Sequence, residues 1–190
     1  MRDTPVLGGT REDTSTKFRD PQWGGTRLRS VSLLKPFTEE ELAILYSHGV
    51  VRQISSGSHV VIEGEPSRGL YLVLRGTVSV HKNDPIKQSL YRIAMLEEGS
   101  HFGELSLFDT APRSATVVAE TACDLFFLDS KDFETFLRQG GQEAEVKFYK
   151  SCLEDLSSRV RQLNADYLQA QQMLWTHALR RDEKTTEPTA

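Results

Sequence analysis

Several features that define common protein classes are scarce in this sequence. Its 190 residues include only two cysteines, Cys123 and Cys152, too few for a disulfide framework, so we expect a reducing, cytoplasmic environment. The formal net charge is −4, from 23 basic and 27 acidic residues, which argues against binding nucleic acid or acidic lipid through overall charge. No apolar run approaches the roughly 18 residues of a membrane span, so we expect no membrane partner.

Catalytic signatures are also scarce. The five histidines have no metal-ligand spacing, and the sequence holds neither a Ser/His/Asp set nor a Gly-Lys-Ser/Thr phosphate loop. We therefore predict that the chain is not an enzyme. Cys123 lies among apolar residues of a predicted strand and is expected to be a buried thiol.

Residues 1–30 show neither helical nor alternating periodicity and mix Gly, Thr, Asp and Arg. We predict a flexible N-terminal arm here, with the folded domain beginning near Val31. Two interpretations stay open. The arm is a solvated leader whose single aromatic docks on the domain, or it is a binding arm. In the second case Arg19, Arg27, Arg29 and Trp23 would grip a phosphate or a base.

Residues 31–137 carry the pattern of a β-rich domain. Thr38 and Glu41 form a capping-box pattern that opens a short helix, and Gly49 ends it. Short apolar or alternating runs then follow, separated by Gly, Asn, Asp and Pro, and residues 70–80 have the alternation of a half-buried strand. Many short strands with regular turns predict a sandwich, roll or barrel. Ser130 is the expected N-cap of a following helix that breaks at Gly140-Gly141.

The C-terminal part has a different periodicity. Apolar residues recur alternately three and four apart over four heptads, which predicts a coiled-coil-like helix over residues 138–180. A helix over residues 143–179 would be about 55 Å long at about 1.5 Å per residue, so we expect homodimerisation through these residues. The alternative is a helix that lies along its own domain. Residues 181–190 are polar and predict a disordered tail. The seam consists of Val146, Tyr149, Leu153, Leu156, Val160, Leu163, Tyr167, Ala170 and Leu174.

Residues 102–117 form the segment most informative about chemistry. It is apolar enough to be partly buried yet contains Glu104 and Arg113, and buried charges need partners. Gly103 allows a tight turn before one helical turn, whose free N–H groups can bind an anion. Arg113 can add a bidentate contact to a phosphate, and Glu104 can accept hydrogen bonds from sugar hydroxyls. Together these features predict a nucleotide pocket. His101, beside the segment, is interpreted as a partly exposed histidine at a strand end.

The sequence of residues 102–117, FGELSLFDTAPRSATV, resembles the phosphate-binding cassette of the cyclic nucleotide-binding domain. That family includes the bacterial catabolite activator proteins and the regulatory subunits of cAMP-dependent protein kinase. Residues 62–80 are similar to the family's glycine-punctuated strands, and the resemblance covers residues 31–137. It implies a mainly β fold with flanking helices: a jelly-roll-like β-roll, followed by a long C-terminal dimerisation helix.

The resemblance also implies a ligand, either cAMP or cGMP, and a binding site. Glu104 would accept a hydrogen bond from the ribose 2′-hydroxyl, and Arg113 would pair with the cyclic phosphate. Asn164 on the long helix would lie near the base, but the neighbouring Leu163 is apolar, so the choice of purine stays open. The expected ligand-binding residues are Gly103, Glu104, Leu105, Arg113, Ser114, Ala115 and Asn164.

From these features we expect a stand-alone cyclic nucleotide receptor that signals to a downstream protein partner by a ligand-dependent conformational change. No winged helix-turn-helix follows the long helix, so we expect no DNA partner. Two alternatives stay open. One is a receptor for a cyclic dinucleotide such as c-di-GMP that uses the Arg/Trp arm, and the other is a ligand-independent dimeric scaffold with a vestigial pocket.

Overall fold

The structure is a computed structural model that describes residues 11–12, 18, 20–84, 86, 89–109 and 111–185, without the side chains of residues 11, 12 and 177–185. The chain divides into two compact units, residues 1–149 and residues 150–190. The first unit holds the strands and the short helices. The second continues the last helix. The predicted tail, residues 181–190, lies outside the part whose side chains are described.

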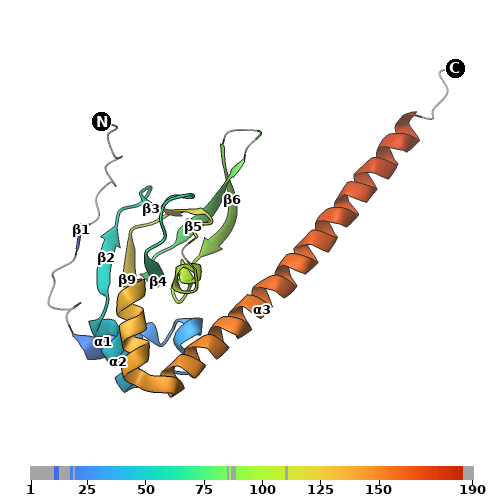
Figure 1. Cartoon of the computed structure of the whole chain (residues 1–190). Helices are drawn as coiled ribbons and strands as arrows, with labels where there is room; N and C mark the ends of the chain where they lie inside the picture. Colours follow the sequence, from blue (N-terminus) through green and yellow to red (C-terminus); the bar gives the residue numbers. More distant parts are fainter. Residues whose placement is uncertain are drawn as a thin grey trace. The chain divides into compact units, whose positions relative to one another are not determined.

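The first unit contains an antiparallel β-roll built from two sheets (Figure 1). The five-stranded sheet has the order β1 (Arg11–Glu12), β2 (Val50–Ile54), β9 (Cys123–Asp129), β4 (Gly69–Arg75) and β7 (His101–Phe102). The four-stranded sheet has the order β3 (His59–Val61), β8 (Thr116–Ala119), β5 (Val78–Asp84) and β6 (Ser89–Leu96). This arrangement confirms the mainly β fold with flanking helices that the turn-punctuated runs predicted.

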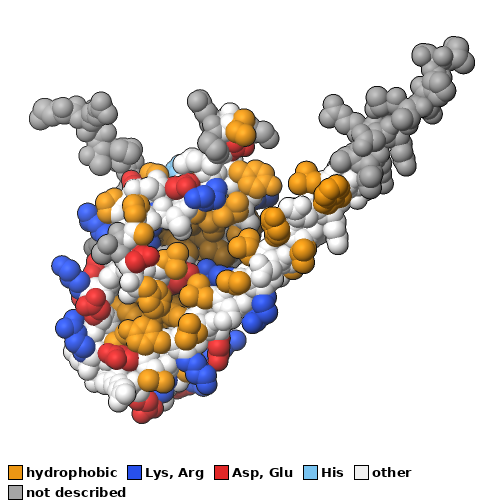
Figure 2. Space-filling model, turned by 45° about the vertical axis from the view of Figure 1, so that its right-hand side comes forward, with side chains coloured by type: hydrophobic (Ala, Val, Ile, Leu, Met, Phe, Trp, Pro, Cys, Tyr) orange, Lys and Arg blue, Asp and Glu red, His pale blue; other side chains and the backbone are white. Residues whose placement is uncertain are grey.

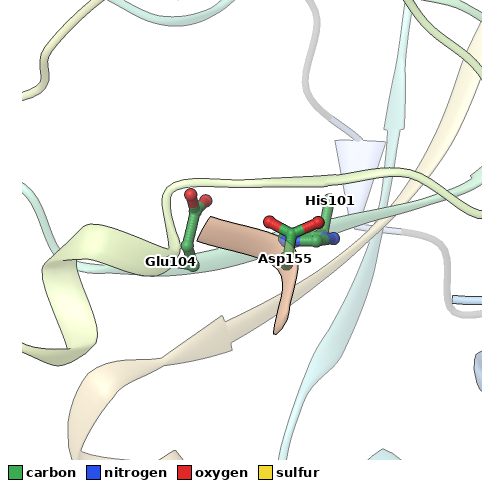
Figure 3. Close-up of side chains that lie close together, drawn as sticks. All are labelled: His101, Glu104 and Asp155. Atoms are coloured by element: carbon green, nitrogen blue, oxygen red, sulfur yellow. The ribbon is translucent and has the colours of Figure 1, made fainter. Parts of the chain in front are cut away.

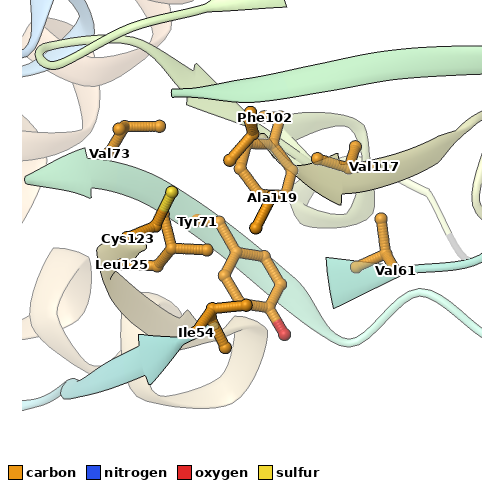
Figure 4. Packing of buried hydrophobic residues seen from close by; sticks show 10 residues of the cluster. Ile54, Val61, Tyr71, Val73, Phe102, Val117, Ala119, Cys123 and Leu125 are labelled. Carbon is orange, nitrogen blue, oxygen red and sulfur yellow. The ribbon is translucent and has the colours of Figure 1, made fainter. Parts of the chain in front are cut away.

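The core of the roll is made of apolar side chains that both sheets contribute (Figure 4). Tyr71 and Val73 of β4 point into this core, and the Tyr71 ring stacks on Phe102 at 5.0 Å between ring centroids. The prediction of a half-buried β4 is wrong, because Leu70, Leu72 and Leu74, on its other face, are also buried. That face lies on the helical side of the sheet, so the strand is covered on both faces. The predicted buried thiol of Cys123 is confirmed.

Three short helices precede the roll: α1 (Pro21–Leu28), η2 (Ser32–Leu34) and α2 (Glu39–Ser47). In α2 the expected capping box is present, since Thr38 accepts from the N–H of Glu41, whose side chain accepts from the N–H of Thr38. The expectation of a flexible arm is wrong for residues 21–28, which form α1. Gly24 makes this helix fit, because a Cβ there would lie 2.2 Å from the ring of Tyr46 on α2.

The last helix, α3 (Ser130–Thr185), follows β9 directly and is interrupted once, at Gly141, where φ is 67° and ψ is −167°. The predicted break at Gly140-Gly141 is therefore confirmed as a kink. The predicted cap is displaced by one residue: Asp129 accepts from the N–H of Lys131 at 2.9 Å, while the Ser130 hydroxyl donates to the Ser106 carbonyl at 3.2 Å. Among the described residues no helix is both long and apolar enough to span a membrane.

The second unit consists of the continuation of α3 beyond residue 149. Its polar residues are interspersed with large apolar side chains that are exposed, and Figure 2 shows hydrophobic side chains uncovered along this helix. Seam residues of this unit with at least half of their surface exposed are Leu153, Val160, Leu163, Tyr167 and Leu174. The helix is thus present as predicted, and most of the surface of these five seam residues is exposed.

Candidate functional site

The site is organised around Gly103, which caps the N-terminus of the short helix η3 (Glu104–Leu107). Its φ is 82°, in the left-handed region that glycine adopts without strain. A Cβ at this position would lie 2.3 Å from Nη1 of Arg113 and 2.9 Å from the carbonyl oxygen of Gly69. Gly103 is therefore needed both for the turn and for the close approach of Arg113.

Arg113 is a buried cation, with 8% of its surface exposed. Its Nη2 donates to the carbonyl of Gly69 at 3.0 Å, and its guanidinium carbon lies 5.7 Å from the centre of the Tyr71 ring. Nη1 is buried and has no hydrogen-bond partner among the described residues. Burial lowers the pKa of Arg113, and the nearby Tyr71 and Glu104 act in the opposite direction. A buried guanidinium with a free donor calls for an anionic acceptor.

The backbone at Arg113 is fixed from both sides by the turn that follows β3. The N–H of Arg113 donates to the carbonyl of Glu65 at 2.8 Å, and its carbonyl accepts from the N–H of Gly64 at 2.9 Å. Gly64 has a φ of 85°, which lets the turn present these two groups. These bonds hold the arginine at the rim of the roll independently of any side-chain partner.

Glu104 is the first residue of η3, and only 5% of its surface is exposed. Figure 3 shows Glu104 at the start of this helix and His101 on the strand that leads to it, β7. His101 is buried, so its interpretation as a partly exposed histidine is wrong: β7 pairs with the covered strand β4. The next turn is tightened by Ser106, whose hydroxyl donates to the carbonyl of Gly103 at 2.6 Å.

The other predicted site residues differ in position. Leu105 is 44% exposed on η3, and Ser114 and Ala115 follow Arg113 at the entrance to β8. The structure thus brings residues 103–105 and 113–115 into one site. Asn164 is an exposed residue of α3 in the second unit, so its expected place near the base stays a prediction.

Two residues at this site were not predicted from the sequence, Lys82 of β5 and Glu63 of the turn after β3. The Lys82 ammonium forms an ion pair with Glu63 and donates to the carbonyl of Ser114 at 2.6 Å. No local signal in the sequence marks them, because the two residues are far apart and meet only through sheet pairing. The strand pattern likewise gives no sign that the ring of Tyr71 lies beside Arg113.

The basic and aromatic residues of the predicted arm are engaged in packing. Trp23 lies edge-on to Phe18 at 5.2 Å, Arg27 pairs with Glu98 at 3.3 Å, and Arg29 pairs with Glu39 at 2.8 Å. Arg19 lies outside the described residues. Each described arginine of the cyclic dinucleotide alternative thus already has a carboxylate partner within the domain.

Residues 51–140 match the family model of the cyclic nucleotide-binding domain. The match spans strands β3 to β9, the left-handed Gly103 and the buried Arg113, so this part of the chain belongs to the cyclic nucleotide-binding domain family. A cyclic nucleotide-binding domain from Methylobacillus flagellatus is 26% identical in sequence. It superposes with a TM-score of 0.65 over 81% of this chain and 84% of that one.

Two curated relatives are regulatory or kinase proteins. The cAMP-dependent protein kinase type II regulatory subunit of Drosophila melanogaster is 34% identical over 121 residues, 63% of this chain and 32% of that protein. The cGMP-dependent protein kinase 2 of Homo sapiens is 31% identical over 155 residues, 80% of this chain and 19% of that protein. The chain therefore spans less than a third of either relative. What it shares with them is a domain.

Proposed function

We propose that the protein is a cyclic nucleotide receptor that binds cAMP or cGMP in the site formed by residues 103–105 and 113–115, and that it signals by a conformational change rather than by catalysis. The observation that carries the proposal is the buried Nη1 of Arg113, which lacks a partner among the described residues. The names of the two kinase relatives, one cAMP-dependent and one cGMP-dependent, support both nucleotides as candidates.

The phosphate and the ribose of a cyclic nucleotide each have a chemical counterpart among the residues of the site. Arg113 would pair with the cyclic phosphate, which supplies the charge that the guanidinium lacks. Glu104 would accept from the ribose 2′-hydroxyl, since a carboxylate offers only acceptors. The N–H groups at the start of η3 and those of Ser114 and Ala115 would complete the phosphate site. Asn164 would contact the base from α3.

The route from the site to α3 runs through η3. The Ser130 hydroxyl, at the start of α3, donates to the carbonyl of Ser106 at 3.2 Å. The ring of Phe108, just after η3, lies 6.0 Å from that of Phe148 and 6.1 Å from that of Tyr149. A phosphate drawn onto Arg113 would pull η3 toward the roll, and these contacts would carry the start of α3 with it. The displaced helix would then present a surface to a downstream protein.

We assign residues 143–179 to a homodimer interface. The exposed apolar seam supports this, because apolar side chains along several helical turns are normally covered by a partner. Replacing Leu163 by Glu should convert a dimer to a monomer in size-exclusion chromatography with light scattering. Replacing the adjacent polar Gln162 by Glu is the matched control. A wild-type protein that is monomeric at high concentration would overturn the assignment.

Calorimetric titration of the folded protein with cAMP, cGMP and c-di-GMP tests the ligand. We expect saturable heat with cAMP or cGMP, lost on Arg113→Ala because the phosphate then has no charged partner; a loss of several kcal/mol corresponds to at least about a hundredfold in affinity. Arg138→Ala is the control, since Arg138 is exposed and its partner among the described residues is Glu134. Binding of c-di-GMP alone would favour the dinucleotide receptor, and no binding of any of the three would favour the ligand-independent scaffold.

A further inference from the structure

The geometry points to Lys82 and Glu63 as an ion pair that positions the phosphate-binding backbone of the site. Lys82 lies on β5 and Glu63 in the turn after β3, so neither belongs to the segments 103–105 and 113–115. This inference rests on the proposed function, since it concerns how the same site holds a cyclic phosphate.

Lys82 connects these two elements with the strand that follows Arg113. Its ammonium group pairs with one carboxylate oxygen of Glu63 and donates to the carbonyl of Ser114 at 2.6 Å. The other oxygen of Glu63 accepts from the N–H of Asn83 at 3.0 Å. The Lys82 side chain keeps 46% of its surface exposed and that of Glu63 21%. The lysine therefore has two fixed acceptors, a carboxylate and one particular backbone carbonyl.

The hydrogen bond from Lys82 to the carbonyl of Ser114 fixes the orientation of the peptide group between Ser114 and Ala115. The carbonyl of Ser114 and the N–H of Ala115 belong to one planar trans peptide, in which they point in opposite directions. Because Lys82 fixes the carbonyl on the β5 side, the N–H of Ala115 is fixed on the opposite side of the chain. This N–H is one of the groups that we assign to the phosphate.

Two further hydrogen bonds hold the turn after β3 against the backbone around Ser114. The N–H of Glu63 donates to the hydroxyl of Thr116 at 3.0 Å, and Thr116 is buried. The adjacent Gly64 donates to the carbonyl of Arg113 at 2.9 Å. The turn after β3 thus holds the carbonyl of Arg113 and the side chain of Thr116, and Lys82 orients the Ser114–Ala115 peptide between them. Hydrogen bonding from Lys82 also lowers the pKa of Glu63, so the Glu63 carboxylate stays ionised near neutral pH.

The first test replaces Lys82 by Met and measures cAMP or cGMP affinity, whichever nucleotide the wild type binds. We expect affinity to fall about tenfold, because one charge-assisted hydrogen bond is lost. Lys35→Met is the control, as Lys35 is exposed at the end of η2 and its loss removes the same charge. An Ala115 amide ¹⁵N–¹H signal that moves downfield with ligand in the wild type should move less in Lys82→Met. Lys82→Arg should restore part of both effects.

The variant Glu63→Gln distinguishes two roles of Lys82, orienting the backbone of the site and attracting the phosphate by charge. If Lys82 acted only as a cation near the phosphate, removing the neighbouring negative charge would raise affinity. If Glu63 holds Lys82 in place, affinity should fall by about threefold, as expected for weakening one exposed pair. Unchanged affinity in Lys82→Met, or a gain in Glu63→Gln, would overturn the positioning role while leaving the proposed function intact. A wild type that binds neither nucleotide overturns both.

Discussion

The ring of Phe108, which follows η3, stacks on the ring of Phe148 in α3 at 6.0 Å between centroids and 16° between ring planes. Phe108 is nevertheless 46% exposed, so the contact leaves much of its ring open to solvent. Such a half-exposed stack stabilises the fold little, since an aromatic pair adds about 0.5–1.5 kcal/mol beyond its area. Its position between the proposed nucleotide site and α3 suits it to carry a ligand-induced displacement from η3 to α3.

Replacing Phe108 by Ala should leave cyclic nucleotide affinity within about threefold of wild type and reduce the response of α3. The reason is that Phe108 contacts α3 and is not assigned to the ligand. Hydrogen exchange of the backbone over residues 142–149, with and without ligand, measures that response. Tyr91→Ala is the control, because Tyr91 is an exposed aromatic residue of β6. An undiminished ligand effect on exchange in Phe108→Ala would contradict this route.

Replacing Arg113 by Met should separate stability from binding. Without ligand, the variant should be as stable as wild type or more stable by about 1 kcal/mol, because an incompletely paired buried charge is replaced by an apolar chain. The ligand-dependent rise in melting temperature should vanish. Arg75→Met is the contrasting variant: Arg75 pairs with the buried Asp124 at 2.9 Å, so its loss should lower stability while preserving the ligand effect. A strongly destabilised Arg113→Met would show that the arginine is mainly structural.

Replacing Gly103 by Ala should be more damaging than the same change at Gly57. Both residues have a positive φ, 82° and 81°, so both variants pay a similar backbone cost of about 1 kcal/mol. At Gly57 the added methyl meets no atom within 4 Å, whereas at Gly103 it meets Arg113 and Gly69. Chemical denaturation and calorimetry should show a larger stability loss and weakened binding for Gly103→Ala alone. Equal effects at the two positions would refute the close-approach argument.

The stability of the folded protein should fall at alkaline pH as Tyr46 ionises. Burial, with a smaller contribution from Asp20, raises the pKa of Tyr46 from 10.0 to about 12. Because the folded pKa lies above the unfolded one, this contribution is fully present below pH 10 and is lost as the pH rises toward 12. The melting temperature of wild type should therefore fall more steeply over that range than that of Tyr46→Phe. Parallel curves for the two proteins would contradict this expectation.

The sequence was a good guide wherever the signal is local. The capping box at Thr38, the break at Gly141 and the turn-separated strands depend on neighbours within a few residues, and all were predicted. The segment around Glu104 and Arg113 was predictable because charged residues stand out within an apolar run. The helix α1 was not predicted, since its two adjacent glycines resemble a linker until the packing on Tyr46 is known.

Contacts between residues distant in the sequence were not predicted, because they form only when strands pair. Lys82 and Glu63 approach each other only because β5 and β3 both pair with β8. The burial of His101 depends likewise on the pairing of β7 with β4. Such contacts follow from strand register, which a single sequence with short strands does not specify.

The buried, half-satisfied guanidinium of Arg113 has a consequence for competition among ligands. A buried donor without a partner contributes to affinity mainly by binding a negatively charged group, and much less through any feature of the base. Adenosine and guanosine carry the same bases and ribose as the cyclic nucleotides but no phosphate, so they would leave this nitrogen as it is in the free protein. If the protein is the receptor proposed above, neutral nucleosides should compete with the cyclic nucleotide only at concentrations far above its own.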